Sequence, residues 1–345
     1  MDARLPLDIR KQQILKAVVS DYTETGVPVG SHALATHLAA WSSATIRNEL
    51  STLVEIGYLL QPHTSAGRVP SDLGYRYYVD FLMEEEAIPV AVRRQLEPYF
   101  RDMPADLEQL LELAASTLAL VTDAVSIVTG PRMLIARAKH LDLISLSARQ
   151  ALVLIVLEGN IIKQQPVTLS ADADQIQLSG LATLFNETFR GLSADEIHSL
   201  PVPSGVQHPL RQELTTHIIE FMRGVDARQD AVVVHDGVRN LLHQPEFVDV
   251  ERLQQVLEVV DEERILGEML TSMEVGQGVS IVIGRESGVA QLAQCSLVLT
   301  TYRAGIGRAG TIGVLGPTRM RYSQVAPRVR YVAQRIGEAV ERILG

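Results

Sequence analysis

The sequence has little of what stabilises extracellular proteins or anchors proteins in membranes. Its 345 residues include one cysteine, Cys295, so no disulfide can form within the chain, which is typical of a reducing cytoplasm. Aromatic residues make up 5% of the chain, which argues against an extracellular, aromatic-rich binding module. No apolar run is long enough to cross a membrane, and Met1–Gln12 lacks the apolar core of a secretory signal. The sequence therefore predicts a cytoplasmic protein with no membrane partner.

The sequence also has no recognisable spacing of catalytic or metal-binding residues. The nine histidines show no metal-ligand spacing, and no nucleophile lies beside a base in a recognisable arrangement. Cys295 precedes the apolar run Ser296–Leu299 and is expected to be a core thiol. Gly305–Gly310 spells G-x-G-x-x-G, but Thr311–Val314 continues as a strand where a dinucleotide site needs a helix. We therefore expect a non-enzyme with no catalytic residues, no cofactor and no metal.

Charge is unevenly distributed along the chain. The formal net charge of −10 argues against a general nucleic-acid binder, but a specific binder needs only a local basic face. Between Glu286 and Glu338 the chain has no acidic residue. The arginines in this stretch are Arg303, Arg308, Arg319, Arg321, Arg328, Arg330 and Arg335. They either bind nucleic acid or pair with acids of an inserted segment or a partner subunit, and pairing is the favoured interpretation.

Three short helices are expected near the N-terminus. Apolar residues follow a 3.6-residue period in Asp8–Glu24, where Asp8 can cap the helix and Gly26 can end it. Ser31 is expected to cap a second, short helix, with Leu34 and Leu38 on its inner side.

The third helix is capped by Ser42 or Ser43 and ends at Gly57. Its inner stripe consists of Ile46, Leu50, Leu53 and Val54. Tyr58–Leu60 and Val69 are then predicted to be two short strands around the hairpin tip Ser65–Arg68. This order of elements is typical of a winged helix, which places one helix in the major groove of DNA.

The outward side of the third helix and the hairpin tip carry the candidate DNA contacts. An arginine can bind guanine O6 and N7, an asparagine can bind adenine N6 and N7, and small methyl groups can meet the thymine methyl. Polar residues and an arginine in the hairpin can bind phosphates or enter the minor groove. The candidates are Ser43, Ala44, Thr45, Arg47, Asn48 and Ser51 on the helix, and His63, Thr64, Ser65 and Arg68 on the wing. The alternative is a solvated helix face beside an ordinary surface turn.

The rest of the chain alternates between helical and strand patterns, with helices inserted into a strand-rich unit. A linker helix is expected at Asp72–Glu86, and Ala91–Val128 is expected to be mostly helical. Strands follow within 131–169, with a hairpin turn at Glu158–Asn160, and then helices to about 245, interrupted by a strand at Ala231–Val234. The remaining predictions are helices at Val250–Val259 and Glu262–Met273, strands at Val279–Ile283, Ser296–Tyr302 and Gly310–Leu315, and a helix at Gln324–Leu344.

Several motifs resemble those of the HrcA family of bacterial heat-inducible transcription repressors. The likeness spans nearly the whole chain, although about 85–230 carries little recognisable signal. The matching segments are Thr25–Gly26, Pro28–Ser31, Ser43–Asn48, Gly57–Leu59, Pro62–Pro70, Gly74–Asp80, Asn240–Leu242, Gln244–Phe247, Gly310–Val314, Gly316–Met320 and Tyr322.

The resemblance implies an α+β, multidomain fold. It implies an N-terminal winged helix-turn-helix domain at 1–72, a linker helix region at 73–104 and a GAF-like α/β domain formed by 105–169 and 276–345. A helix-rich dimerising domain is then inserted at 170–275.

The resemblance also implies a function. The protein would bind double-stranded DNA at an inverted-repeat operator called CIRCE as a homodimer and repress chaperone operons until heat stress releases it, with the GroEL chaperonin assisting its activity. We also expect that a marginally stable repressor can act as its own thermometer. The alternative is a small-molecule-sensing winged-helix regulator that binds its ligand in the GAF-like domain.

Overall fold

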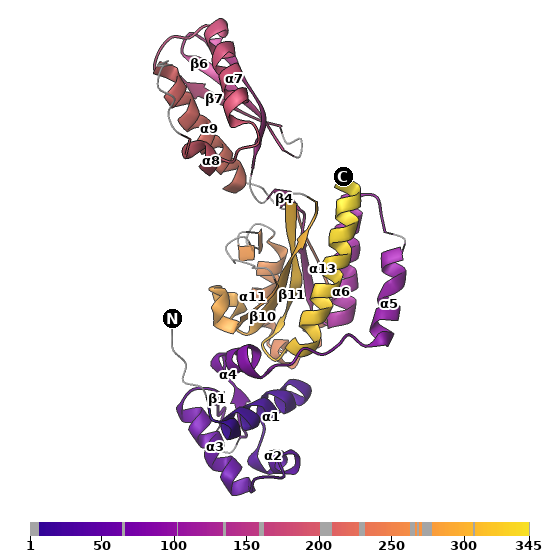
Figure 1. The fold of residues 1–345 in the computed structure, drawn as a ribbon. Helices are drawn as coiled ribbons and strands as arrows, with labels where there is room; N and C mark the ends of the chain where they lie inside the picture. Colours follow the sequence, from indigo (N-terminus) through magenta and orange to yellow (C-terminus); the bar gives the residue numbers. More distant parts are fainter. Residues whose placement is uncertain are drawn as a thin grey trace. The chain divides into compact units, whose positions relative to one another are not determined.

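The computed structural model describes most of the chain and divides it into two compact units (Figure 1). Unit 1 comprises Met1–Pro131, Ala231–Gly305 and Gly310–Gly345, and unit 2 comprises Arg132–Asp230 and Ile306–Ala309. The described residues are 7–63, 66–101, 103–133, 136–158, 162–200, 209–227, 232–262, 266–267, 269–270, 278–305 and 308–344. The mixed helices and strands confirm the α+β, multidomain prediction.

The N-terminal part of unit 1, residues 7–82, forms what we call the head. Its first elements are α1 (Ile9–Thr25), α2 (Ser31–His37), α3 (Ser43–Glu55), β1 (Leu59–Leu60) and β2 (Val69–Pro70). Asp8 caps α1 by accepting a hydrogen bond from the Lys11 amide at 2.9 Å, and Gly26 ends it at a left-handed φ of 65°. The predicted helices and paired strands are confirmed, except that Gly30, rather than Ser31, caps α2.

The predicted linker helix has a different form and a closer attachment than expected. It runs as α4 (Asp72–Tyr77) and continues as the π-helix η1 (Tyr78–Leu82), so it ends four residues before Glu86. The Tyr77 side chain is 2% exposed, and its hydroxyl accepts a hydrogen bond from the Leu7 amide at 3.1 Å. The segment is therefore packed into the head and is no free linker.

The remainder of unit 1 is built on a mostly antiparallel sheet, which we call the sheet domain together with its helices. The strand order is β8-β3-β11-β10-β9. The short pairing of β4 with Arg308 and Ala309, at the start of β11, belongs to unit 2. The strands are β3 (Val125–Thr129), β4 (Arg132–Met133), β8 (Val233–Asp236), β9 (Val279–Ile283), β10 (Cys295–Arg303) and β11 (Arg308–Pro317). The three C-terminal strands were predicted correctly.

One prediction for this sheet was wrong. Val125–Thr129 is a strand, although it lies mostly within the stretch predicted to be helical. It is a short apolar run, which periodicity alone cannot assign to helix or strand. The strand predicted near Ala231–Val234 is confirmed as β8, and it pairs with β3 of this sheet.

Helices cover both faces of this sheet. Successive side chains of a strand point to opposite faces, so Val298 packs with α6 (Leu107–Thr122) and α13 (Tyr322–Leu344), whereas Leu297 and Leu299 pack with the side carrying α11 (Val250–Asp261). Figure 1 shows α5 (Val90–Arg101) outside α6 and α13, where Phe100 meets Tyr331 edge-on at 6.0 Å. The smaller elements are α10 (Val238–Leu242), η2 (Pro245–Phe247), η3 (Gly284–Ser287) and η4 (Ala290–Leu292).

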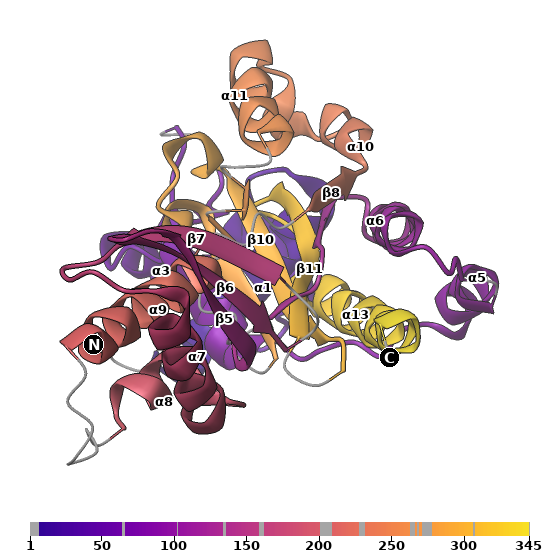
Figure 2. The ribbon, with the colours of Figure 1, turned by 90° about the horizontal axis from the view of Figure 1, so that it is seen from above.

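Unit 2 has its own core. Its antiparallel sheet consists of β5 (Ala138–Ser147), β6 (Gln150–Leu157) and β7 (Ile162–Thr168). Figure 2 shows α7 (Gln175–Phe189), α8 (Ala194–His198) and α9 (Pro209–Ala227) on one side of this sheet. Leu143, Val153 and Ile155 are buried in the same cluster as Leu181 and Phe185.

This grouping differs from the predicted domain boundaries. The strands β5–β7 were assigned to the GAF-like domain, but they form a separate three-stranded sheet and share their core with α7–α9. Unit 2 therefore begins at Arg132 rather than at residue 170. Gly159 and Asn160 of the predicted turn lie outside the described residues, as does most of the predicted helix Glu262–Met273.

The wing offers a test of the head fold at Gly67. Arg68 and Val29 exchange backbone hydrogen bonds of 2.8 and 2.9 Å, and a Cβ on Gly67 would lie 2.5 Å from the Pro28 carbonyl oxygen. Gly67→Ala should therefore destabilise the head by about 1–3 kcal/mol, and each kcal/mol lowers the melting midpoint of a small domain by roughly 4–8 °C.

The measurement is thermal unfolding followed by the fluorescence of Trp41, the one tryptophan of the chain, which packs partly buried in the head. Gly30→Ala is the matched control, because nothing lies within 4 Å of a Cβ there. Equal melting midpoints for the two variants would contradict the close approach of Gly67, in the wing, to the Pro28 carbonyl.

Candidate nucleic-acid interface

Helix α3 is anchored by one apolar side. Ile46, Leu50 and Leu53 are at most 3% exposed, and Val54 packs partly buried against the same cluster. Their spacing at i, i+4, i+7 and i+8 forms one continuous stripe, as predicted. Because this stripe faces the head core, the opposite side of α3 must face away from it.

The first turn of α3 settles which serine caps the helix. Ser42 has extended backbone angles and its hydroxyl accepts a hydrogen bond from the Thr45 amide at 3.1 Å. Ser43 instead lies 3.2 Å from the Ser31 hydroxyl, so it joins α3 to α2 and is half-buried. The first amides of a helix carry a partial positive charge that favours a phosphate nearby.

Two side chains on α3 are free to bind a ligand. Arg47 and Asn48 are exposed, and neither side chain makes a hydrogen bond within the described part of the chain. Ala44 is exposed as well, whereas Ser51 is half-buried and donates to the Arg47 carbonyl at 3.1 Å. The structure thus presents an arginine, an asparagine and a methyl group together, which are groups that recognise base edges.

Glu49 is a residue of α3 that the sequence analysis missed. Its side chain is 15% exposed and lies 3.2 Å from Arg10 Nη1 and 3.1 Å from Lys11 Nζ. Hydrogen bonds to Asp8 and then to Glu49 raise the pKa of Lys11. Arg10 also lies over the Trp41 ring, 6.0 Å from its centroid. These pairs tie α3 to α1 and neutralise a carboxylate that would otherwise repel phosphate.

The wing residues are only partly described. Thr64 and Ser65 lie outside the described residues, and His63 is exposed. Arg68 is half-buried, and its Nη1 donates to the Ala66 carbonyl at 3.1 Å. Arg68 therefore stiffens the wing tip in addition to being a candidate phosphate contact.

Three of the seven arginines of the C-terminal region form ion pairs among the described residues of unit 1. Arg319 binds Glu246, and both terminal nitrogens of Arg330 lie 2.7 Å from the Glu85 carboxylate. Arg335 pairs with Glu338 at 2.9 Å on α13 itself. Only Glu246 belongs to the predicted insert, so the expected pairing with the insert is confirmed for Arg319, whereas Arg330 and Arg335 pair with acids outside it.

The described part of the chain offers little support for a metal site, a membrane span or a reactive thiol. Its residues contain no group of three histidine, cysteine, aspartate or glutamate side chains placed to hold a metal. Among its helices none is both long and apolar enough to span a membrane. Cys295 is buried, as predicted, and burial raises the pKa of its thiol to about 12.

The chain is similar to known proteins over nearly its whole length. A family model described as the HrcA protein C terminal domain matches residues 108–326. The heat-inducible transcription repressor HrcA of Herpetosiphon aurantiacus is 35% identical over 333 residues, covering 95% of this chain and 94% of that protein. The protein of the same name from Pelotomaculum thermopropionicum is 34% identical over 352 residues, covering 99% of each. A crystal structure described as a hypothetical protein at 2.2 Å resolution shares the fold, with a TM-score of 0.60, 24% identity and coverage of 98% and 100%.

The pairing of Glu49 predicts a measurable contribution to the stability of the head. Glu49→Gln removes two ion pairs that are only partly exposed, so we expect a loss of about 1 kcal/mol in the unfolding transition of the head. Glu55→Gln is the control, since Glu55 is exposed at the end of α3. Trp41 fluorescence melts report the difference, and equal midpoints for the two variants would refute an anchoring role for Glu49.

Proposed function

Because this chain belongs to the HrcA family of heat-inducible transcription repressors, we propose that it represses chaperone operons by binding an inverted-repeat DNA operator as a dimer. In this proposal the operator is CIRCE, heat stress releases the protein, and the GroEL chaperonin helps it to reach its active form.

The observation that carries DNA binding is the exposure of Arg47 and Asn48 on an anchored helix. Adjacent arginine and asparagine side chains can each form two hydrogen bonds to a base, to guanine and adenine respectively. The N-terminal turn of α3 and the wing supply contacts to phosphates, which fix the register on the duplex. In this proposal the base contacts recognise the sequence, and the phosphate contacts position α3 on the duplex.

Unit 2 offers the surface for the dimer. The side of its sheet opposite α7–α9 carries apolar residues on all three strands, and the register places Ile144 beside Leu152 and Val156 beside Ile162. Ile144 is 42% exposed and Ile162 is 65% exposed. An apolar face of this kind suits a second copy of the same face, which is how a two-fold dimer forms. We therefore assign the dimerising role to unit 2, residues 132–230.

Release by heat follows from the separation of these two proposed roles, DNA binding by the head and dimerisation by unit 2. Operator affinity depends on both heads binding at once, because linking them makes the second contact intramolecular. Native domains lie only ~5–15 kcal/mol below their unfolded states. Loosening of unit 2 on heating then separates the heads and lowers operator affinity before the heads themselves unfold.

Base reading by α3 gives a first prediction. Arg47→Ala and Asn48→Ala should each erase most of the preference for the inverted repeat over a scrambled duplex, since a two-pronged base contact contributes about 1–3 kcal/mol of discrimination. Arg68→Ala should weaken binding to both duplexes alike and flatten the salt dependence. Gel shifts at two salt concentrations separate these outcomes.

The control for this experiment is Arg149→Ala, which removes an exposed arginine of unit 2 that pairs with Asp172 at 2.6 Å. It should leave affinity and specificity unchanged. Loss of discrimination in Arg68→Ala with retention in Arg47→Ala would mean that α3 is not the reading helix.

The dimer surface gives a second prediction. Ile144→Asp places a charge on the apolar sheet face and should convert the dimer to monomers in sedimentation velocity, because an unpaired charge cannot be buried cheaply. Leu200→Asp is the control. Leu200 is 39% exposed, against 42% for Ile144, but it lies after α8 in unit 2. A dimeric Ile144→Asp variant would rule this face out as the interface.

A further inference from the structure

Helix α4 is bound on two sides at once. On the head side, the Tyr77 hydroxyl accepts hydrogen bonds from the Leu7 amide at 3.1 Å and from Gln12 Nε2 at 3.3 Å. The Tyr77 ring also meets Tyr58 edge-on, with centroids 5.2 Å apart. Because these contacts link α4 to α1 and to the start of the wing, α4 moves with the head.

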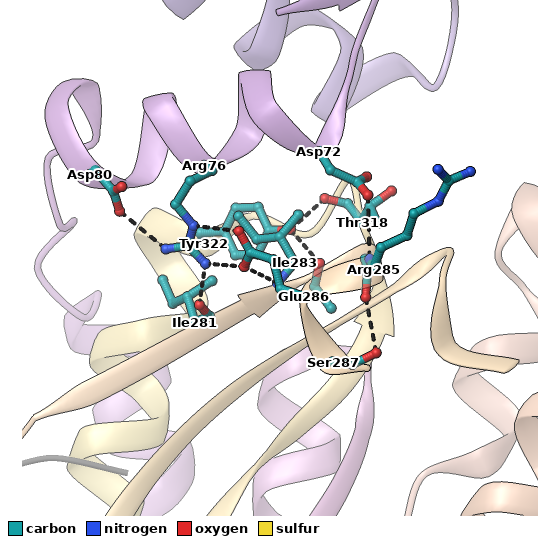
Figure 3. A network of polar contacts seen from close by, with 12 residues as sticks. Asp72, Arg76, Asp80, Ile281, Ile283, Arg285, Glu286, Ser287, Thr318 and Tyr322 are labelled. Carbon is teal, nitrogen blue, oxygen red and sulfur yellow. Dashed lines mark hydrogen bonds and ion pairs between the residues drawn. The ribbon is translucent and has the colours of Figure 1, made fainter. Parts of the chain in front are cut away.

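On its other side α4 is bound to the sheet domain through Arg76 (Figure 3). Arg76 Nε donates to Glu286 Oε1 at 2.9 Å, its Nη2 pairs with the second Glu286 oxygen, and it also donates to the Ile281 carbonyl. Glu286 is held in turn by the Ile283 amide at 2.9 Å. The Arg76 side chain is only 17% exposed. A two-pronged, mostly buried pair of this kind fixes orientation as well as distance.

Asp72, one turn before Arg76 on α4, also contacts the η3 turn. The Arg285 amide lies 3.3 Å from Asp72 Oδ2, and a Cβ on Gly284 would come within 2.6 Å of that oxygen. Gly284 also has a φ of +55°, which favours glycine. Tyr75 adds an edge-on contact with Tyr322, at a centroid distance of 6.0 Å. The first turn of α4 is thus fitted to the η3 turn at several atoms.

A second connection lies at the C-terminal end of α1. Arg319, in the turn between β11 and α13, binds Glu246, donates to Gln244 Oε1 at 2.8 Å and reaches the Thr23 carbonyl of α1 at 3.4 Å. Its side chain is 15% exposed. Two separate attachments, one at α4 and one at the end of α1, prevent the head from swinging about either of them.

We propose that Arg76 and Arg319 are positioning residues that fix the orientation of the head on the sheet domain, and so set the half-site spacing that the dimer accepts. This proposal rests on the proposed function. In a two-fold dimer, two reading helices match one spacing only if each head is held rigidly. A head freed from these contacts stays tethered, tolerates other spacings and loses effective concentration at the preferred one.

The test is a spacing series with the full-length protein. Duplexes carry the inverted repeat at the spacing that the wild type binds best, the same half-sites separated stepwise by up to about half a helical turn (~5 bp), or a single half-site. Wild type, Arg76→Ala, Arg76→Lys and Glu286→Gln are compared by fluorescence anisotropy, with Arg149→Ala as the control. Trp41 melts and far-UV circular dichroism check that each head remains folded.

The expected result is specific to positioning. Arg76→Ala should bind the duplex with the preferred spacing about tenfold more weakly, because it loses part of the avidity that comes from linking the two heads. Its affinity for the single half-site should stay unchanged, and its spacing profile should flatten. Arg76→Lys should fall between, because lysine keeps the charge and loses the two-pronged geometry. Glu286→Gln keeps the shape of the side chain, so its profile should flatten without a folding defect.

The outcomes that overturn the proposal differ from those that overturn the proposed function. A wild-type spacing profile in both Arg76→Ala and Glu286→Gln would show that the contacts do not set the spacing. Tighter binding by these variants would show that the contacts hold the heads in a non-binding orientation, which also overturns it. A wild type that binds the inverted repeat no better than a single half-site would overturn the dimeric repressor itself.

Discussion

The burial of Ile46, Leu50 and Leu53 in the head core determines where every polar group of α3 points. Burying these three side chains stabilises the head by several kcal/mol in transfer free energy, at about 1.5–3 kcal/mol each, and it leaves α3 one rotational setting. Arg47 and Asn48 are then exposed by geometry, and neither side chain makes a hydrogen bond within the described part of the chain. The Glu49 pairs with Arg10 and Lys11 reinforce the same setting from the flank.

The same logic extends from α3 to the rest of unit 1. Tyr77 contacts α1 of the head, and Arg76 contacts η3 and β9, so a helix of six residues joins the head to the sheet domain. A base-reading helix that is rigid within its head gains from such a coupling, because specificity for an inverted repeat depends on where both heads are held. In the proposed mechanism unit 2, which has a separate core and an exposed apolar sheet face, loosens without unfolding the head.

The elements that follow from local chemistry could be predicted from the sequence. The caps Asp8 and Ser42, the stop at Gly26 and the stripe of α3 each depend on residues within a few positions of one another. The face of α3 that carries Arg47 and Asn48 follows from the same stripe. Thr64 and Ser65 remain predictions.

What the sequence could not reveal depends on distant partners. Val125–Thr129 is an apolar run whose pairing with β8 and β11 decides that it is a strand. The strands β5–β7 join α7–α9 because their inward residues find a core there, which no local pattern announces. Arg76 lies 210 positions from Glu286, and Glu49 lies 39 positions from Arg10, so their pairing required the fold.

Site-specific photo-crosslinking from Ala44→Cys tests the central claim most directly. Ala44 is exposed on the first turn of α3, and the native Cys295 is 2% exposed, so a thiol-reactive crosslinker should attach at position 44. The account predicts crosslinks to bases of the inverted repeat from position 44 and none from Ala91→Cys, an exposed site on α5. A labelled protein that retains operator affinity yet forms no crosslink from position 44 would contradict it, because α3 would then not lie in the groove.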